Sequence, residues 1–284
     1  NLTRDHMDYF KTMDEQKEAK FRLFLELIPS SKPLDFEPFS VVCEDDEAGK
    51  ELARRAKKAG ARLATVSLKN PDADFYVCDA KLKIDGTSAK AVLKETKESF
   101  ALKTNLIGAH NLENVALSAA ALIMLGFKPS EVFSTFGRLR LSIPGRLEEI
   151  QNERGIKVFV DYAHTDDGLR KIISAVRAVS NKRLIIIAGA GGDRDKGKRA
   201  PMGKAACMAD LAIITCDNPR TENPLDIIAG VAAGCEESGK TRLAGFDEAA
   251  SRDGYVIEPD RGKAIFNAIN ICAKPGDVLI IAGK

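Results

Sequence analysis

Residues 184–224 read LIIIAGAGGDRDKGKRAPMGKAACMADLAIITCDNPRTENP, and this stretch decides the fold. It contains two apolar runs, Leu184–Ala188 and Leu211–Thr215, that are too short for helices and rich in β-branched residues. Such runs are typical of strands that are buried on both faces of a parallel sheet. A short helix is expected between them, at about Pro201–Ala209. The stretch is therefore predicted to be a β-α-β unit with polar residues at the carboxyl ends of both strands, where open α/β sheets bind ligands.

Strands and helices continue to alternate on both sides of this unit. Three further strands are expected, at Val158–Tyr162, Thr241–Gly245 and Val278–Ala282. The intervening segments carry apolar residues at helical spacing. We therefore predict an α/β fold that ends in a doubly wound, mainly parallel, Rossmann-like sheet. The turn-rich segment Ser142–Arg146 is the best domain boundary, dividing the chain into residues 1–142 and 143–284.

The first of these two parts mixes helices with extended segments. Helices are predicted at Asp14–Ile28, Gly49–Lys58, Asn111–Leu125 and Pro129–Arg138. Strands are predicted at Phe39–Cys43 and Arg62–Leu68, with alternating β structure over residues 74–106. The segment Pro29–Pro38 is expected to be a loop, and Asp85-Gly86-Thr87 indicates a hairpin turn.

Composition excludes several classes of protein. The chain has 284 residues, of which 44% are hydrophobic, and 43 Lys+Arg balance 41 Asp+Glu, so we expect no nucleic acid partner. The six cysteines lack CxxC spacing, which favours reduced thiols in a cytoplasmic protein. No apolar run reaches about 18 residues, so we expect no membrane span, and no signal peptide is recognisable. The chain begins with Asn1 rather than Met, and we expect both ends to be cut.

The glycine-rich turn after the first quoted strand nearly matches a phosphate-binding loop, GxxxxGK[ST]. The last position fails, because Arg199 stands where a hydroxyl group must reach Mg²⁺. A true phosphate loop and a solvated basic turn stay open as alternatives, and we favour an anion-binding loop that uses Arg194. After the second strand, Asp217-Asn218-Pro219-Arg220 could be an ordinary turn. An arginine at a strand's carboxyl end can also bind a carboxylate through two parallel hydrogen bonds.

The three histidines, His6, His110 and His164, all lie in polar segments beside Asp or Asn. A lone histidine is usually structural, but three of three in such surroundings favours a function. Lys20 lies fourteen residues after His6, on the otherwise apolar side of its predicted helix. Its ordinary interpretation is a lysine whose stem covers apolar surface while the ammonium group reaches water.

Taken together, six motifs resemble the Mur ligase family, and in particular its diaminopimelate-adding members. The motifs are Asn1–His6, Gly108–Asn114, Ile143–Arg146, Val160–Thr165, Gly191–Arg199 and Asp217–Glu222. They extend over essentially the whole chain in the family's order, and the combination is highly specific. The resemblance implies part of a central ATPase domain followed by a Rossmann-like C-terminal domain.

The resemblance also implies an activity. Members of this family join an amino acid to a peptide carboxylate that ATP has first phosphorylated. We therefore expect an ATP- and Mg²⁺-dependent amide ligase that adds meso-diaminopimelate to UDP-MurNAc-L-Ala-D-Glu in peptidoglycan synthesis. It is expected to be a monomer in the bacterial cytoplasm.

The roles of single residues follow from the same resemblance. His6 matches a Mg²⁺ ligand of the family, and Lys20 matches its carbamylated lysine. The residues implied for ATP are Asn111, Asn114, Arg146, Asp161 and His164. Those implied for diaminopimelate are Arg194, Asp217, Asn218, Pro219, Arg220 and Gly283.

The sequence departs from the family pattern at its ends. The phosphate loop and the domain that binds the UDP sugar are absent, and the closing Gly-Lys-Gly-His-Glu motif stops at Gly283-Lys284. We therefore expect a segment of a longer enzyme, inactive by itself. Two alternatives remain: a sister ligase that uses L-lysine or a folylpolyglutamate-like substrate, and a non-catalytic dinucleotide-binding module. The second lacks the third spaced glycine of GxGxxG.

Overall fold

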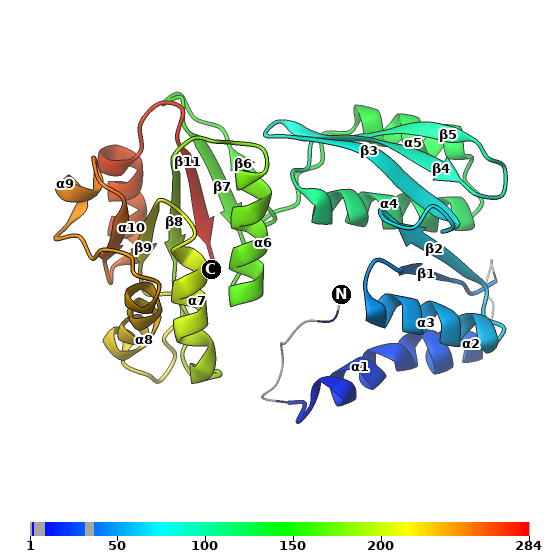
Figure 1. Cartoon of the computed structure of the whole chain (residues 1–284), viewed down its shortest axis with the longest axis horizontal. Helices are drawn as coiled ribbons and strands as arrows, with labels where there is room; N and C mark the ends of the chain where they lie inside the picture. Colours follow the sequence, from blue (N-terminus) through cyan, green and yellow to red (C-terminus); the bar gives the residue numbers. More distant parts are fainter. Residues whose placement is uncertain (1, 3–8, 32–36, 284) are drawn as a thin grey trace. The chain divides into compact units, whose positions relative to one another are not determined.

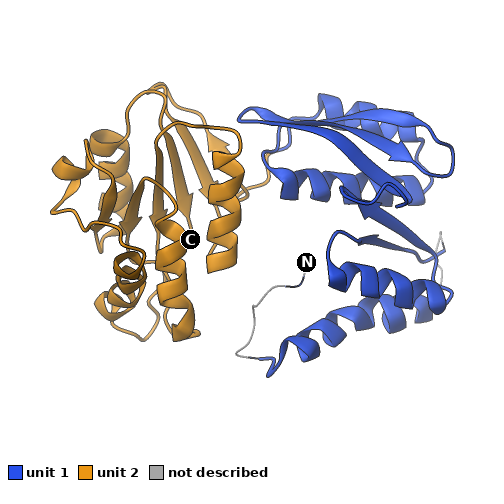
Figure 2. Ribbon diagram, in the orientation of Figure 1, with its two compact units in different colours: residues 1–141 blue, residues 142–284 orange. Residues whose placement is uncertain are grey.

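The computed structural model describes residue 2 and residues 9–31 and 37–283. It divides into two compact units, residues 1–141 and residues 142–284 (Figure 2). Each unit has its own sheet and its own hydrophobic core. None of the helices within the described ranges is long and apolar enough to cross a membrane.

Unit 1 is built on a five-stranded sheet in the order β1-β2-β3-β4-β5. The strands are β1 (Ser40–Cys43), β2 (Leu63–Ser67), β3 (Phe75–Lys83), β4 (Gly86–Leu93) and β5 (Ser99–Thr104). The helices are α1 (Met13–Arg22), α2 (Ile28–Ser30), α3 (Glu47–Lys58), α4 (Ala109–Met124) and α5 (Pro129–Arg138). β1, β2 and β3 are parallel, whereas β3, β4 and β5 form an antiparallel meander.

Local sequence explains these elements. Asp46 accepts the N–H of Gly49 and so begins α3, in the way that helix N-caps do. Gly86 opens β4 with φ +144°, and a Cβ there would lie 2.5 Å from the Thr104 carbonyl oxygen, so the predicted hairpin needs glycine at this point. The predicted helix over residues 14–28 is confirmed, but it runs on through Pro29, where a loop was expected. A π-helical turn, Leu23–Leu27, joins α1 to α2.

Unit 2 contains a six-stranded sheet in the order β10-β9-β8-β11-β7-β6. Figure 1 labels β9, β8, β11, β7 and β6 of this sheet. The strands are β6 (Glu148–Ile150), β7 (Lys157–Asp161), β8 (Leu184–Ala188), β9 (Leu211–Ile214), β10 (Gly254–Ile257) and β11 (Val278–Ala282). The helices are α6 (Asp166–Arg177), α7 (Arg199–Ala206), α8 (Pro224–Glu237), α9 (Phe246–Ala249) and α10 (Arg261–Asn267). Five strands are parallel, and only β6 is antiparallel, at the edge.

The middle strands of this sheet are buried on both faces, as their apolar runs predict. Ile185 and Ile187 pack with α9 and α10 in one core cluster, while Ile186 lies between them on the opposite side of the strand. Burying one such side chain contributes about 1.5–3 kcal/mol. Helices therefore cover both faces, which confirms the predicted doubly wound sheet.

The predicted strand at Thr241–Gly245 is wrong. Arg242 makes only an isolated parallel bridge to Tyr255, and the edge strand of the sheet is β10. Two hydrogen bonds with Tyr255, one from the Leu243 N–H and one to the Thr241 carbonyl, hold this segment beside β10. The chain then turns into α9 after Gly245, so no ladder develops. β6 was also missed, because its Glu-Glu-Ile sequence lacks a strand-like apolar pattern.

Parallel strands place all their carboxyl ends on one side of the sheet. We call this side the carboxyl edge, and the opposite side, where the same strands begin, the amino edge. Asp161, Ala188, Ile214, Ile257 and Ala282 are the last residues of the five parallel strands and so mark the carboxyl edge.

Candidate active site

Two loops meet at the carboxyl edge, one after β8 and one after β9. Gly192 N–H donates to the Asn218 carbonyl over 2.8 Å, and Arg220 Nη1 donates to the Gly192 carbonyl over 2.5 Å. A Cβ on Gly192 would lie 1.9 Å from the Pro219 carbonyl oxygen. Only glycine allows the loops to approach so closely.

The next residue of the first loop continues this contact. Asp193 has φ +53°, and its carboxylate accepts the N–H and the hydroxyl group of Thr221. The Asp193 N–H donates in turn to Glu222 Oε1 over 2.7 Å. The backbone conformation of Asp193 is uncommon for a residue with a side chain, and these three bonds hold it in place.

An ion pair that was not predicted from the sequence lies behind these loops. Arg199 Nη2 lies 2.7 and 2.8 Å from the two oxygens of Glu222, and Lys196 Nζ lies 3.5 Å away. The hydrogen bond from Arg199, helped by the Asp193 N–H, lowers the pKa of Glu222 to about 2. Arg199 is buried, and its Nε finds no hydrogen-bond partner among the described residues. The ion pair therefore fixes the two loops against each other.

A third chain segment reaches the same edge from β11. Gly189 has no side chain, and a Cβ there would lie 2.5 Å from the Thr215 carbonyl and 3.1 Å from the Asp217 nitrogen. The segment after β9 can therefore cross the end of β8 and bring Asp217 close to Gly283. A Cβ on Gly283 would lie 3.5 Å from the Asp217 carboxylate. Gly283 has φ +89°, and its N–H donates to the Asp161 carbonyl.

The residues predicted for the amino acid thus lie on one edge of one sheet. Asp217, Asn218, Pro219, Arg220 and Gly283 follow β9 and β11, and Arg194 lies on the loop after β8. Arg194, Asn218 and Arg220 are exposed. The bond from Arg220 Nη1 to Gly192 orients a guanidinium group at the surface of the edge. Such a group can form paired hydrogen bonds with a carboxylate.

The residues of unit 2 predicted for ATP lie at the end of β7. Asp161 is buried, and its two oxygens accept the N–H groups of Leu147 and Ala163, each over 2.8 Å. Each oxygen therefore keeps one further lone pair for a ligand. The same bonds tie the segment that follows Arg146 to the strand.

An exposed cluster of rings and charge lies beside Asp161. The Arg146 guanidinium lies 5.6 Å from the centre of the Tyr162 ring, and the Tyr162 and His164 rings meet edge to face at 5.4 Å. His164 Nδ1 lies 3.0 Å from the Tyr162 carbonyl, so Nδ1 carries a proton and the other ring nitrogen faces outward. Tyr162 was not predicted from the sequence as a member of this cluster, although its position between Asp161 and His164 could have indicated it.

In unit 1, the two predicted adenine residues lie in the first turns of α4. Asn111 is buried, and its amide donates to the Ile107 carbonyl over 2.9 Å. Asn114 is exposed, and its amide lies 3.5 Å from the Asn111 side-chain oxygen. The helix thus holds Asn111 rigidly and presents Asn114 to solvent.

Lys20, also in unit 1, lines a cavity of about 260 Å³. Phe21 and Phe24 contribute apolar walls, and Glu113 and Asp46 contribute carboxylates. The other predicted metal ligand, His6, lies outside the described residues. The cavity therefore combines an amine with acidic neighbours on largely apolar walls.

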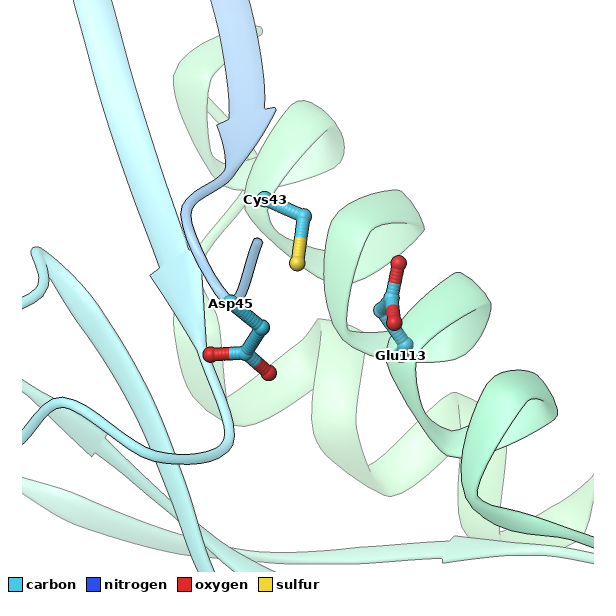
Figure 3. Close-up of side chains that lie close together, drawn as sticks. All are labelled: Cys43, Asp45 and Glu113. Atoms are coloured by element: carbon cyan, nitrogen blue, oxygen red, sulfur yellow. The ribbon is translucent and has the colours of Figure 1, made fainter. Parts of the chain in front are cut away.

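Cys43 and Asp45, at the end of β1, lie near Glu113 of α4 (Figure 3), with potential ligand atoms within 4.8 Å of one another. Asp45 already accepts the Ser67 hydroxyl and the Leu68 N–H. Burial, with a further contribution from the Glu113 charge, raises the pKa of Cys43 to about 12. The three side chains therefore form a polar contact between the end of β1 and α4 in which Cys43 is a protonated thiol.

Comparison with known families accounts for both units. Residues 1–122 match the model of the Mur ligase middle domain, and residues 145–284 match the model of the Mur ligase glutamate ligase domain. The chain belongs to the Mur ligase family. Its α/β fold, with a mainly parallel second sheet, is the fold of solved Mur ligases.

Individual Mur ligases resemble the whole chain. The UDP-N-acetylmuramoyl-L-alanyl-D-glutamate–2,6-diaminopimelate ligases of Lawsonia intracellularis and Geobacter metallireducens are each 37% identical over 100% of the chain, which covers 54% of each relative. A solved ligase of the same name is 31% identical, with a TM-score of 0.60 over 99% of the chain and 53% of its own. The chain thus spans about half the length of these relatives.

Proposed function

We propose that the protein is an ATP-dependent ligase that adds meso-diaminopimelate to the D-glutamate carboxylate of UDP-MurNAc-L-Ala-D-Glu. Residues 1–142 would be the C-terminal part of its ATP-binding domain, and residues 143–284 would bind the amino acid. ATP activates the carboxylate as an acyl phosphate, the amine attacks the acyl carbon, and phosphate leaves. Such chemistry depends mainly on positioning and on neutralising charge.

The observation that carries the proposal is the loop pair at the carboxyl edge. Hydrogen bonds join Gly192 to Asn218 and to Arg220, so the Arg220 guanidinium is held on the same edge of the sheet as Asp217 and Gly283. Diaminopimelate carries two ammonium and two carboxylate groups. Asp217 suits an ammonium group, whereas Arg220, Asn218 and Arg194 suit the distal carboxylate. The relatives described above carry the name of this same reaction.

We assign the nucleotide and the metal to the other predicted residues. Asn111 and Asn114 would contact adenine, Asp161 the ribose hydroxyls, and Arg146 and His164 the nucleotide. The spare lone pairs of Asp161 and the outward Nε2 of His164 fit these roles. A Mg²⁺ ion would supply charge neutralisation when bound.

Lys20 and His6 would hold that Mg²⁺ ion. A plain ammonium group repels a cation, whereas a carbamate on Lys20 presents the oxygen ligands that Mg²⁺ prefers. The position of Lys20 at a cavity with acidic neighbours supports this assignment.

The main alternative is a sister ligase that adds L-lysine, whose side chain ends without a carboxylate. A site built on Arg220 would leave its cation unpaired with lysine. A direct test incubates the native protein with ATP, Mg²⁺, the UDP-MurNAc dipeptide and one of three amino acids: meso-diaminopimelate, L-lysine or L-glutamate. We expect phosphate release and tripeptide product with meso-diaminopimelate above the other two. Equal or higher rates with L-lysine or L-glutamate would contradict the proposal.

The metal assignment has its own test in Lys20→Ala. We expect ligation to fall below detection in the native protein and to return in part when short carboxylic acids are added, because they replace the missing carbamate. Lys17→Ala is a matched control on the same helix, since Lys17 pairs with Glu51 over 3.2 Å outside the cavity lining. Wild-type activity in Lys20→Ala would show that Lys20 is no metal ligand.

A further inference from the structure

Arg261, the first residue of α10, has a place at the carboxyl edge that the proposed site does not explain. Its Nη2 donates to the Ala282 carbonyl over 2.9 Å, at the last residue of β11. Its Nη1 is buried and has no hydrogen-bond partner among the described residues. A buried donor without a partner is unfavourable, so Arg261 keeps its place at the end of β11 despite this cost.

The chain after β10 brings Arg261 to this place. β10 runs parallel to β9, and the following residue, Glu258, still donates its N–H to Ile214. The Pro259 carbonyl then accepts the Cys216 N–H over 3.4 Å. Asp260 accepts the Lys263 N–H and begins α10. The backbone just before Arg261 therefore lies beside the end of β9, and the Arg261 side chain extends to the end of β11.

The charges around Arg261 indicate what it does there. Burial lowers the pKa of Arg261, and the nearby Asp217 carboxylate opposes that shift. Arginine stays protonated in proteins, so a lasting positive charge faces Asp217. Asp217 is also the carboxylate that lies against Gly283, the residue after Ala282.

We propose that Arg261 is a positioning residue of the amino-acid site, which holds the Ala282–Gly283 end of β11 and the Asp217 carboxylate in fixed relation to each other. The inference rests on the proposed function, in which Asp217 and Gly283 contact the amino acid. Arg261 itself acts from behind them. Without it, the carboxylate loses its buried countercharge and the end of β11 loses its anchor.

Arg183 provides a matched control in the same unit. It lies at the amino edge, where it donates to the Cys272, Ala249 and Arg252 carbonyls and pairs with Asp253 over 3.1 Å. Both arginines thus anchor backbone carbonyls, but only Arg261 lies beside Asp217. A merely structural arginine should behave like Arg183.

The test measures KM for meso-diaminopimelate, kcat and the melting temperature of the native protein in Arg261→Gln, Arg261→Lys and Arg183→Gln. We expect Arg261→Gln to raise KM by about tenfold or more, with a smaller change in kcat. Arg261→Lys keeps the charge and should recover part of this loss. Arg183→Gln should lower the melting temperature and leave KM unchanged.

Two results separate this inference from the proposed function. If the wild-type protein ligates meso-diaminopimelate and folded Arg261→Gln keeps its KM, the inference is wrong and the function stands. If the wild-type protein does not ligate meso-diaminopimelate, both are wrong. Should Arg261→Gln fail to fold, Arg261→Lys combined with Asp217→Asn decides: KM effects that are not additive support the coupling, and additive effects overturn it.

Discussion

The two edges of the six-stranded sheet carry the same kinds of residue, but these residues have different roles. At the amino edge, Arg183 makes four hydrogen bonds, and Asp210 accepts the Leu184 N–H and pairs with Arg177 over 2.7 Å. At the carboxyl edge, Arg220 is exposed and Arg261 keeps a buried donor without a partner among the described residues.

This difference indicates which edge of the sheet has polar groups available to bind a ligand. Polar groups at the amino edge are occupied by the protein's own backbone, so they contribute to stability. Groups at the carboxyl edge are held in place by a few bonds and still have donors to offer. Substitutions at the amino edge should therefore change stability, and substitutions at the carboxyl edge should change ligation.

The largest effect is expected from Gly192→Ala at the carboxyl edge. A Cβ at this position would overlap the Pro219 carbonyl, so the loop that carries Asn218 and Arg220 must move. Misplacing binding groups by about 1 Å can cost roughly 100-fold in rate. We expect kcat/KM for meso-diaminopimelate to fall by at least that factor while circular dichroism shows an intact fold.

Gly239→Ala is the matched control near the amino edge. Gly239 follows α8 with φ +76°, and a Cβ there would meet nothing within 4 Å. It should cost about 1 kcal/mol of stability through backbone strain and leave kcat/KM unchanged. Equal activity in the two variants would remove the distinction between the edges.

A smaller effect, on stability alone, is expected from Arg183→Gln. The variant loses hydrogen bonds to three backbone carbonyls, which should cost about 2 kcal/mol in the free energy of unfolding. Urea unfolding measures this cost, and ligation assays below the transition should match wild type. A loss of activity without a loss of stability would place a function at the amino edge.

The smallest effect concerns the acid stability of the Arg199–Glu222 ion pair behind the carboxyl-edge loops, which is satisfied within the protein and so, like the amino-edge groups, contributes to stability. The pKa of Glu222 is lowered to about 2 by Arg199, so its carboxylate stabilises the folded state above the ordinary value of 4.5. That contribution is lost as the pH falls from 4.5 to 2. Glu222→Gln should therefore be less stable than wild type at pH 6, and urea unfolding should show the gap closing as the pH falls through this window. A gap that does not depend on pH would exclude this ion pair as its source.

The amino-acid sequence predicts the sheet of unit 2 well where strands are buried on both faces. A short continuous apolar run such as Leu184–Ala188 is removed from water on both sides in the middle of a covered sheet. Such runs therefore identify central strands. Edge strands carry weaker patterns. β10 has only four residues, and two of the three residues of β6 are acidic, and both strands were missed for this reason.

The residues of the candidate site also fall into those that the sequence predicts and those that it does not. Parallel topology alone predicts that Asp217 and Gly283 share an edge, and the family resemblance supplied the candidate residues. The partnership of Arg199 with Glu222, and that of Arg261 with Ala282, could not be predicted. These residues lie 23 and 21 positions apart, and their meeting depends on how three loops cross one another. No local pattern encodes such a crossing.

The central claim is that Arg220, at the carboxyl edge, binds the distal carboxylate of meso-diaminopimelate and so selects this amino acid over L-lysine. The most direct measurement is the ratio of kcat/KM for meso-diaminopimelate to that for L-lysine, in the native protein, in Arg220→Ala and in Arg170→Ala, an exposed arginine of α6 that serves as control. Sites built around a polar group reject analogues that lack it by on the order of 10⁴. We predict a ratio of that order in wild type and Arg170→Ala, and a fall of at least about 100-fold in Arg220→Ala. A wild-type ratio near one, or a ratio that Arg220→Ala leaves unchanged, would contradict the account.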